Sequence, residues 1–340
     1  MTRAERYRAA GVDLDAAEQA KRRIAESVAS TRTALARGVV GAFGGMIRLP
    51  EGFEHPVLVM STDGVGTKVL VAIRAGRHDT VGEDLVNHSV NDILVHGATP
   101  LAFLDYLAVA GVSTDTIAAL VEGVARGCRE HDMTLTGGET AQLPDLYQPG
   151  HYDLAGTIVG VVEEGRALHG DAVRVGDVLV GYASSGLHTN GYTLARRVLF
   201  EELGLDVDGM VPGLGVAVGD ELLKVHRSYW RSIAPVLGRV RALAHITGGG
   251  IPGNLGRSLP EGCAAEIERT SWEVPGIFRV LEEAGKVSPE EMFEVFNMGL
   301  GMVAVVAAAD EQAVRQAARD AGVDSWVVGR VVGGSGVRVV

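Results

Sequence analysis

The stretch that most restricts the fold is residues 57–68, where an apolar run ends in a short glycine-rich loop. The first part of this stretch is rich in β-branched residues and predicts a buried strand. The loop contains Asp63, Gly64, Gly66 and Lys68. Glycines let backbone N–H groups approach an anion, an aspartate can hold Mg²⁺, and a lysine can neutralise phosphate oxygens. The spacing is not that of a P-loop, so it indicates another kind of phosphate loop or an ordinary turn that ends a strand.

The length and the glycine content indicate two domains with many tight turns. The chain has 340 residues, enough for two domains that each bury a core. It contains 46 glycines without a collagen-like period, which is about twice the usual share of roughly 7%. We therefore expect turns or ligand-binding loops at the ends of many strands.

The charge and the cysteines restrict the class of partner. The net charge of −12 argues against non-specific binding to nucleic acid or to an anionic membrane. Cys128 and Cys263 have no partner spacing and are expected to be reduced thiols of a cytoplasmic protein. The charged N-terminus predicts no signal peptide, and no apolar run is long enough to span a bilayer.

Three further acidic residues lie in or after predicted elements of the first half. Residues 79–96 predict a helix with a main apolar stripe of Val86, Val90, Ile93 and Leu94. Asp92 lies on another face, in line with His88. Asp105 lies within an apolar strand, and Glu139 follows two glycines. Each carboxylate either faces water or is directed at a ligand or cation. If Asp92 faces water, we expect it to form an ion pair with His88.

The second half repeats the order of a strand followed by a polar, glycine-rich loop. Residues 184–192 follow one predicted strand, and Asn190 is a suitable N-cap for a helix over 192–203. Residues 245–252 contain three glycines and end in Pro252, which suits the first turn of a helix. Both loops would bring free N–H groups and hydroxyls together, which favours an anion site.

The domain boundary is predicted near residue 168, within a polar connector. Each side of it mixes strands, helices and glycine-rich loops, which predicts two α/β or α+β domains facing a shared cleft. Residues 38–45 contain four glycines and form either a flap over a ligand or a plain linker.

Several of these loops together resemble one family, in the same order and over nearly the whole chain. The family is phosphoribosylformylglycinamidine cyclo-ligase, also called aminoimidazole ribonucleotide synthetase. The matching segments are Tyr7–Asp13, Thr62–Lys68, Val90–Ala98, Phe103–Tyr106, Gly137–Ala141, Ser184–Tyr192, Ile246–Gly250 and Asn297–Met302.

The resemblance implies a fold, an activity and an oligomeric state. The fold is shared with selenophosphate synthetase and thiamine monophosphate kinase. Strands of the N-terminal ATP-binding and dimerisation domain, residues 1–168, join those of a second subunit in a barrel. The C-terminal domain, residues 169–340, covers the barrel and completes the substrate site. The implied activity is the ATP-dependent ring closure of formylglycinamidine ribonucleotide in purine biosynthesis, by a homodimer in the cytoplasm.

The resemblance also implies site residues for ATP, Mg²⁺ and the ribonucleotide. Asp63 and Asp92 would hold Mg²⁺, and Asp63, Lys68 and His188 would act in catalysis, with His188 either transferring a proton or only binding substrate. The residues implied to bind ATP are Phe43, Gly44, Gly64, Val65, Gly66, Thr67, Lys68, Asn91, Asp105, Gly138 and Glu139. Those implied to bind the ribonucleotide are Ser185, His188, Asn190, Thr247, Gly248, Gly249 and Asn297.

The chain departs from the family pattern at three places. The glycine-rich segment has Ala42 where many relatives have glycine, and Ala25 stands where a lysine often follows the Arg-Ile pair of the first helix. Residues 225–229 differ from the usual Pro-Thr-Arg-Ile-Tyr at three positions. The missing lysine argues against a contact between the first helix and the nucleotide.

Two other classes of protein remain as alternatives. One is a small-molecule kinase of the same fold, such as thiamine monophosphate kinase, which the loop at 184–192 disfavours. The other is a nucleotide-binding scaffold, which would keep the glycines but lose the acids. Asp63, Asp92, Asp105 and Glu139 are all present, which favours catalysis.

Overall fold

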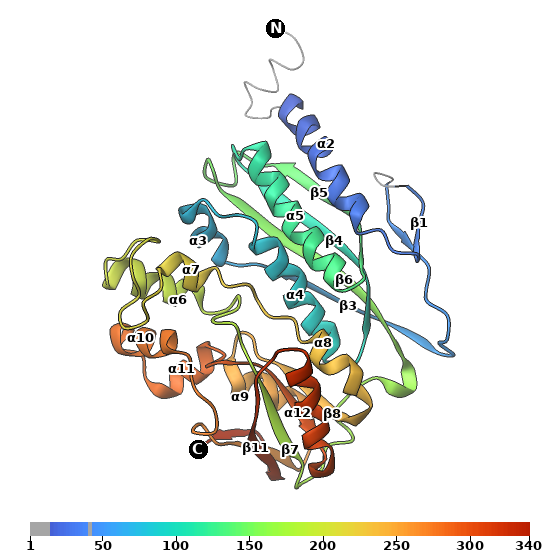
Figure 1. The fold of residues 1–340 in the computed structure, drawn as a ribbon, viewed down its shortest axis with the longest axis vertical. Helices are drawn as coiled ribbons and strands as arrows, with labels where there is room; N and C mark the ends of the chain where they lie inside the picture. Colours follow the sequence, from blue (N-terminus) through green and yellow to red (C-terminus); the bar gives the residue numbers. More distant parts are fainter. Residues whose placement is uncertain (1–13, 40–42) are drawn as a thin grey trace.

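The computed structural model describes residues 14–39 and 43–340. The first half contains a four-stranded sheet with helices on one side (Figure 1). Its helices are α2 (Leu14–Ser30), α3 (Lys68–Ala75), α4 (Val81–Leu94) and α5 (Thr114–Glu130). Its strands are β3 (Pro56–Gly64), β4 (Thr99–Val109), β5 (Thr134–Gln142) and β6 (Tyr152–Glu163), preceded by the short pair β1 (Ala36–Arg37) and β2 (Met46–Ile47).

The strand order in this sheet is β3-β6-β4-β5, and only β4 and β5 run parallel. Helix α4 packs on β3 and β6, α5 packs beside it, and α2 covers α5 (Figure 1). The apolar stripe predicted for α4 is confirmed, since Val86, Val90 and Ile93 are fully buried. The core of this half therefore lies between the sheet and one layer of helices.

The opposite face of the first sheet is uncovered over part of its area. Leu58 and Met60 of β3 are 47% and 64% exposed, and Leu104 and Tyr106 of β4 are 37% and 41% exposed. The prediction that residues 57–60 form a buried strand is therefore wrong for one face. Val59 alternates with these exposed residues and packs against the helices.

Helices α4 and α5 approach each other closely at glycines. A methyl group on Gly82 of α4 would overlap the carbonyl oxygen of Leu120, and one on Gly123 of α5 would overlap the carbonyl oxygen of Asp79 and lie 3.2 Å from Cα of Gly82. Main chain therefore lies directly against main chain where the two helices meet.

The second half contains a six-stranded sheet in the order β12-β9-β11-β7-β10-β8. One face is covered by an apolar cluster that includes α9, and the other by a cluster that includes α12 and Leu94 of α4. Its strands are β7 (Val178–Ala183), β8 (Val240–His245), β9 (Cys263–Ile267), β10 (Leu300–Val306), β11 (Ser325–Gly333) and β12 (Val337–Val339). Its α-helices are α6 (Tyr192–Arg196), α7 (Val218–Leu222), α8 (Trp230–Ile233), α9 (Gly250–Leu255), α10 (Gly276–Gly285), α11 (Pro289–Val295) and α12 (Glu311–Asp320).

Two predictions about the second half are corrected. The helix expected over 192–203 is α-helical only in α6 and continues as a π-helix, η2 (Arg197–Glu202). Asn190 is not its N-cap, because Gly191 takes that position in a left-handed conformation and no side chain caps the helix.

Among the described residues, no helix is long and apolar enough to cross a membrane.

Candidate active site

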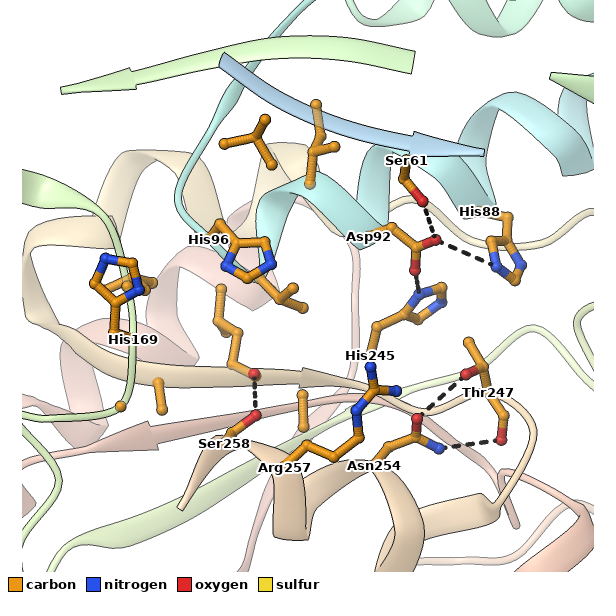
Figure 2. A pocket seen from close by; sticks show the side chains of 18 of the residues that line it. Ser61, His88, Asp92, His96, His169, His245, Thr247, Asn254, Arg257 and Ser258 are labelled. Atoms are coloured by element: carbon orange, nitrogen blue, oxygen red, sulfur yellow. Dashed lines mark hydrogen bonds and ion pairs between the residues drawn. The ribbon is translucent and has the colours of Figure 1, made fainter. Parts of the chain in front are cut away.

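A pocket of about 600 Å³ lies between the two halves of the chain (Figure 2). The first half contributes β3 and α4, and the second contributes β8, α9 and the short helix η4 (Gly256–Ser258). Most side chains that line it are polar or carry titratable groups, as Figure 2 shows for Asp92, His96 and Arg257. The predicted cleft between two domains is therefore present.

Two carboxylates predicted to hold metal meet in this pocket. Asp63 lies near the end of β3, and Asp92 lies in the last turn of α4. Asp63 Oδ2 is 3.5 Å and Asp92 Oδ2 is 3.6 Å from Nε2 of His88. Both carboxylates are partly exposed to the pocket, so the pair fits Mg²⁺, which takes one or two carboxylates and completes its shell with water and substrate phosphate.

Asp92 is held ionised by its neighbours. Burial alone raises the pKa of this carboxyl, but the hydrogen bond from His245 and the nearby imidazoles hold the pKa well below its ordinary value. The Nδ1 atom of His245 donates to Asp92 Oδ1 at 2.8 Å, and Ser61 Oγ donates to Oδ2 at 3.1 Å. Burial lowers the pKa of His88, whereas Asp63 and Asp92 raise it, and the net shift is upward.

Four buried histidines lie together beside the pocket and form what we call the histidine cluster: His88, His188, His226 and His245. Of these, His88 and His245 line the pocket. Nε2 of His226 is 3.1 Å from Nε2 of His245, and the rings of His188 and His226 stack with centroids 4.0 Å apart. Burial lowers the pKa of His188, His226 and His245, in the first two cases well below the ordinary value. These three imidazoles are therefore neutral at pH 7.

Polar groups of the second half face the carboxylates across the pocket. Asn190 and Thr247 line the pocket, and the buried amide nitrogen of Asn190 has no hydrogen-bond partner in the described part of the chain. Asn254 closes the glycine loop by donating to the carbonyl oxygens of Thr247, Gly248 and Gly250. Arg257 also lines the pocket, and its guanidinium has no hydrogen bond or ion pair among the described residues. Asn190 and Arg257 thus present unused donors to a ligand.

Asp63 and Asp105 lie in one row across the first sheet. Gly156 of β6 pairs with both, and Asp105 pairs in turn with Gly138 of β5. Burial raises the pKa of Asp105 to about 6. Glu139 follows Gly138 and pairs with Tyr106, whose side chain is exposed on the uncovered face. Within one chain, Glu139 therefore lies across the sheet from the other three acids.

The structure places Lys68 outside the pocket. Its ammonium group is fully buried, 2.8 Å from Asp84 Oδ1, and donates to the carbonyl oxygens of His188 and Lys224 at 3.2 and 2.7 Å. All three ammonium protons have protein acceptors. The predicted contact between Lys68 and phosphate is therefore not available in this conformation.

The backbone of the 63–68 loop adopts the expected glycine conformation at only one of its two glycines. Gly66 has a positive φ of 70°, whereas Gly64 does not. Val65 is 1% exposed and belongs to the core, and Thr67 Oγ1 lies 3.2 Å from Thr193 Oγ1 of α6. Gly66 and Thr67 thus lie where the loop approaches the second half of the chain.

Several predicted ligand residues instead hold loops in place. Ser185 Oγ donates to the carbonyl oxygen of Val225, and its N–H donates to His188 Nε2. Asn297 binds the Ser184 hydroxyl and the carbonyl oxygen of Gly186. Asn91 binds the backbone of Arg227 and Tyr229. None of Ser185, His188, Asn297 and Asn91 lines the 600 Å³ pocket.

The glycine-rich segment lies elsewhere in the described structure. The Phe43 side chain is fully exposed, and Gly44 has no neighbour within 4 Å of an added Cβ. Gly45 lies against Thr136 of β5. Gly41 and Ala42 lie outside the described residues, so the flap stays a prediction.

Sequence reasoning missed two residues of the site, His245 and Arg257. His245 directly precedes the predicted 246–250 loop, and Arg257 follows the helix that this loop begins. A scan for cationic side chains about two helical turns beyond a glycine loop would have found Arg257. Only the fold brings His245 to Asp92, because the two are 153 positions apart.

Comparison with known structures supports the fold. The chain is similar to thiamine-monophosphate kinase from Stenotrophomonas maltophilia K279a, with a TM-score of 0.69 and 20% identity over 94% of this chain and 95% of that one. It is also similar to HypE of E. coli, with a TM-score of 0.66 and 17% identity over 95% and 93% of the two chains. At such low identity the likeness establishes the architecture, and the predicted fold of two mixed α/β domains is confirmed, while the barrel across two subunits stays a prediction.

Comparison by sequence is far closer. Residues 44–162 match the N-terminal domain, and residues 174–340 the C-terminal domain, of the family AIR synthase related protein. The chain is 48% identical to phosphoribosylformylglycinamidine cyclo-ligase of Sorangium cellulosum (strain So ce56), over 96% of this chain and 95% of the relative. It is 47% identical to the protein of the same name from Myxococcus xanthus (strain DK1622), over 97% and 96%. The chain thus belongs to the phosphoribosylformylglycinamidine cyclo-ligase family.

Proposed function

We propose that this chain closes the imidazole ring of aminoimidazole ribonucleotide, using formylglycinamidine ribonucleotide and ATP and releasing ADP and phosphate. The observation that carries the proposal is the identity of 46 to 48% with cyclo-ligases along almost the entire chain. The likeness to the kinase of the same fold is 20%, so it supports the architecture and not kinase activity.

The reaction takes place in two steps. The formyl oxygen attacks the γ-phosphorus of ATP, the bond to the bridging oxygen breaks, and ADP leaves. The phosphorylated oxygen is then a good leaving group. An amidine nitrogen attacks the former formyl carbon, the C–O bond breaks, and phosphate departs with loss of a proton from nitrogen. Positioning of the reactants and stabilisation of charge supply most of the rate enhancement in such a site.

The first half of the chain would bind the nucleotide. Asp63 and Asp92 fit a Mg²⁺ ion, which when bound would neutralise phosphate charge. Gly66 and Thr67 lie just beyond Asp63 and would follow the triphosphate. Asp105 occupies the same row of the sheet as Asp63 and would extend the polar edge. Glu139 lies on the open face of the sheet, so it would contribute to nucleotide binding only together with a second subunit packed on that face.

The second half would bind the ribonucleotide. Asn190 offers an unused amide N–H group, and Arg257 offers an unpaired guanidinium, which suits a phosphate dianion. Thr247 and the backbone of Gly248 and Gly249 lie between them in the same loop region. His188 would act as a positioning residue, since its ring stacks on that of His226 and its Nε2 atom accepts a hydrogen bond from the backbone N–H of Ser185.

The uncovered face of the first sheet would bind a second copy of this chain. The face carries Leu58 and Met60 of β3 and Leu104 and Tyr106 of β4, two strands that flank β6, and an apolar patch of this kind marks an interaction site. Pairing of two such faces across a twofold axis would form the barrel expected for the family.

We further propose a domain boundary near residue 168 and a cytoplasmic location.

The test is phosphate release from ATP with Mg²⁺, with and without formylglycinamidine ribonucleotide, coupled to a colorimetric assay for aminoimidazole. We expect release that depends on the ribonucleotide and matches the aminoimidazole one to one. Phosphoryl transfer to thiamine monophosphate, without aminoimidazole formation, would replace the proposal with a kinase of the same fold.

A further inference from the structure

Three members of the histidine cluster have the geometry of metal ligands. The ring centroids of His88, His226 and His245 are 5.0 to 5.2 Å apart in all three pairs, and the ring planes cross at 62 to 72°. Each ring offers a nitrogen within 4.8 Å of a nitrogen on the other two. We call these three rings the imidazole triangle. They come from α4, from the segment before α8 and from the end of β8, so only the tertiary fold brings them together.

The Nδ1 atom of every ring in the triangle has a partner on the outside. His245 Nδ1 donates to Asp92 at 2.8 Å, and Nδ1 of His88 and of His226 lie 2.9 and 3.3 Å from Thr189 Oγ1. A hydroxyl oxygen can accept two hydrogen bonds, so Thr189 can orient both rings through Nδ1. Histidine ligands of metals are usually oriented in this way, through a hydrogen bond from the nitrogen that does not bind the metal. The Nε2 atom of His88 lies 3.5 and 3.6 Å from the carboxylates of Asp63 and Asp92.

The protonation of His226 follows from Asn91. The Asn91 amide is oriented by two backbone groups, because its oxygen accepts from Tyr229 N–H and its nitrogen donates to the Arg227 carbonyl oxygen. The same nitrogen lies 3.2 Å from His226 Nε2 and can only donate. His226 Nε2 therefore carries a lone pair.

His245 Nδ1 faces Asp92 Oδ1, so Nε2 is the nitrogen that His245 directs at His226. The two Nε2 atoms lie 3.1 Å apart. Two ligands of a tetrahedral zinc ion, at about 2.05 Å each, lie about 3.3 Å apart. The separation of the two nitrogens is close to that value.

We propose that His88, His226 and His245 bind one transition-metal ion such as Zn²⁺, with the open coordination position facing the pocket. His88 and His245 line the pocket and give the ion access, while His226 is fully buried beneath them and shielded by the stacked His188 ring. Three imidazoles and one open position are a usual ligand set for zinc, whereas Mg²⁺ prefers oxygen.

This site is distinct from the carboxylate pair proposed to hold Mg²⁺, although the two adjoin. Asp92 holds Nδ1 of His245 at 2.8 Å, and His88 is shared by the two groups, because its Nε2 atom also lies 3.5 and 3.6 Å from Asp63 and Asp92. The inference does not depend on the proposed reaction, because metal binding is measured without ATP or ribonucleotide.

The first experiment uses Co²⁺ as a spectroscopic probe on the full chain after treatment with a chelator. We expect one Co²⁺ per chain, with the intense visible bands of a four-coordinate ion, displaced by Zn²⁺ and not by a large excess of Mg²⁺. His226→Gln should weaken binding by at least about 10-fold, whereas His169→Gln, which removes an imidazole of the same pocket outside the triangle, should not. A weak six-coordinate spectrum, displacement by Mg²⁺, or equal affinity in His226→Gln would overturn the proposal.

The second experiment needs no variant, so it decides the matter even if His226→Gln fails to fold. X-ray absorption at the zinc edge of the wild-type protein with one equivalent of Zn²⁺ should show scattering from three imidazole rings at about 2.0 Å. A shell of oxygen atoms without imidazole scattering would sink the site.

Discussion

The ammonium of Lys68 lies 2.8 Å from the carboxylate of Asp84, and both side chains are completely enclosed. Breaking a buried ion pair by removing one partner leaves an uncompensated charge, which costs about 3–5 kcal/mol. We expect Lys68→Met to lower the free energy of unfolding by about this amount in urea titrations. Arg74→Met, which breaks the exposed pair with Asp206, should cost less than about 1 kcal/mol. A stable Lys68→Met enzyme with a raised KM for ATP would instead restore the phosphate role predicted from the sequence.

Asp63→Asn should remove most of the ATP turnover while the fold stays intact. The substitution keeps the shape of the side chain and removes the charge that would hold Mg²⁺, a contribution of several kcal/mol to the transition state. We expect kcat to fall by at least about 100-fold, with an unchanged circular dichroism spectrum. Asp171→Asn, an exposed acid next to the pocket wall, is the control and should keep full activity. An active, Mg²⁺-dependent Asp63→Asn enzyme would remove Asp63 from the metal site.

Arg257→Gln should impair use of the ribonucleotide and not of ATP. A hydrogen bond to a charged group contributes about 1.5–3 kcal/mol, so kcat/KM for formylglycinamidine ribonucleotide should fall about 10- to 100-fold, mainly through KM. The KM for ATP should not change. The matched control is Arg279→Gln, on the exposed side of α10. An equal loss for both substrates would place Arg257 at the nucleotide or make its effect structural.

Ionisation of Asp105 should lower the free energy of unfolding as the pH rises from about 4 to 6. Burial raises its pKa in the folded state to about 6, above the ordinary value of 3.8. The folded state therefore binds more protons than the unfolded state in this window, and its stability decreases as the proton is lost. In Asp105→Asn this part of the pH dependence should disappear. Urea titrations of both proteins from pH 4 to 7 measure the difference, and parallel profiles would show that Asp105 ionises normally.

Met60→Glu should convert the proposed dimer to a monomer. Met60 is 64% exposed on the uncovered face, and a twofold interface would bury the new carboxylate from both copies without a partner. Sedimentation velocity at micromolar concentration should show half the mass of the wild-type species. Val327→Glu, at a residue of β11 that is 41% exposed, should leave the mass unchanged. A wild-type protein that sediments as a monomer would contradict the proposed homodimer.

The sequence predicted features that depend on local order. The apolar period of α4 located Val86, Val90 and Ile93 in the core, and the alternation of strands with glycine loops predicted two mixed domains around a cleft. Local patterns could not show that one face of β3 is uncovered, because apolar residues such as Leu58 and Met60 are equally compatible with a strand buried on both faces.

Contacts between distant loops escaped prediction. Asp84 is sixteen positions from Lys68, and the carbonyl oxygens that complete the ammonium shell come from residues 188 and 224. No periodicity marks such a set. Likewise, His226 was noted only as a departure from a family pattern, and its approach to His245 depends on how the segment before α8 crosses α4.

The glycines between α4 and α5 have a consequence for how the pocket can adapt. Side chains in an interface can change rotamer and let a helix roll, but backbone pressed against backbone has no such freedom. We therefore expect helix α4 to keep its position against α5 when a ligand binds, and fitting to a substrate to occur on the other wall, where Asn190, Thr247 and Arg257 are carried by loops and short helices.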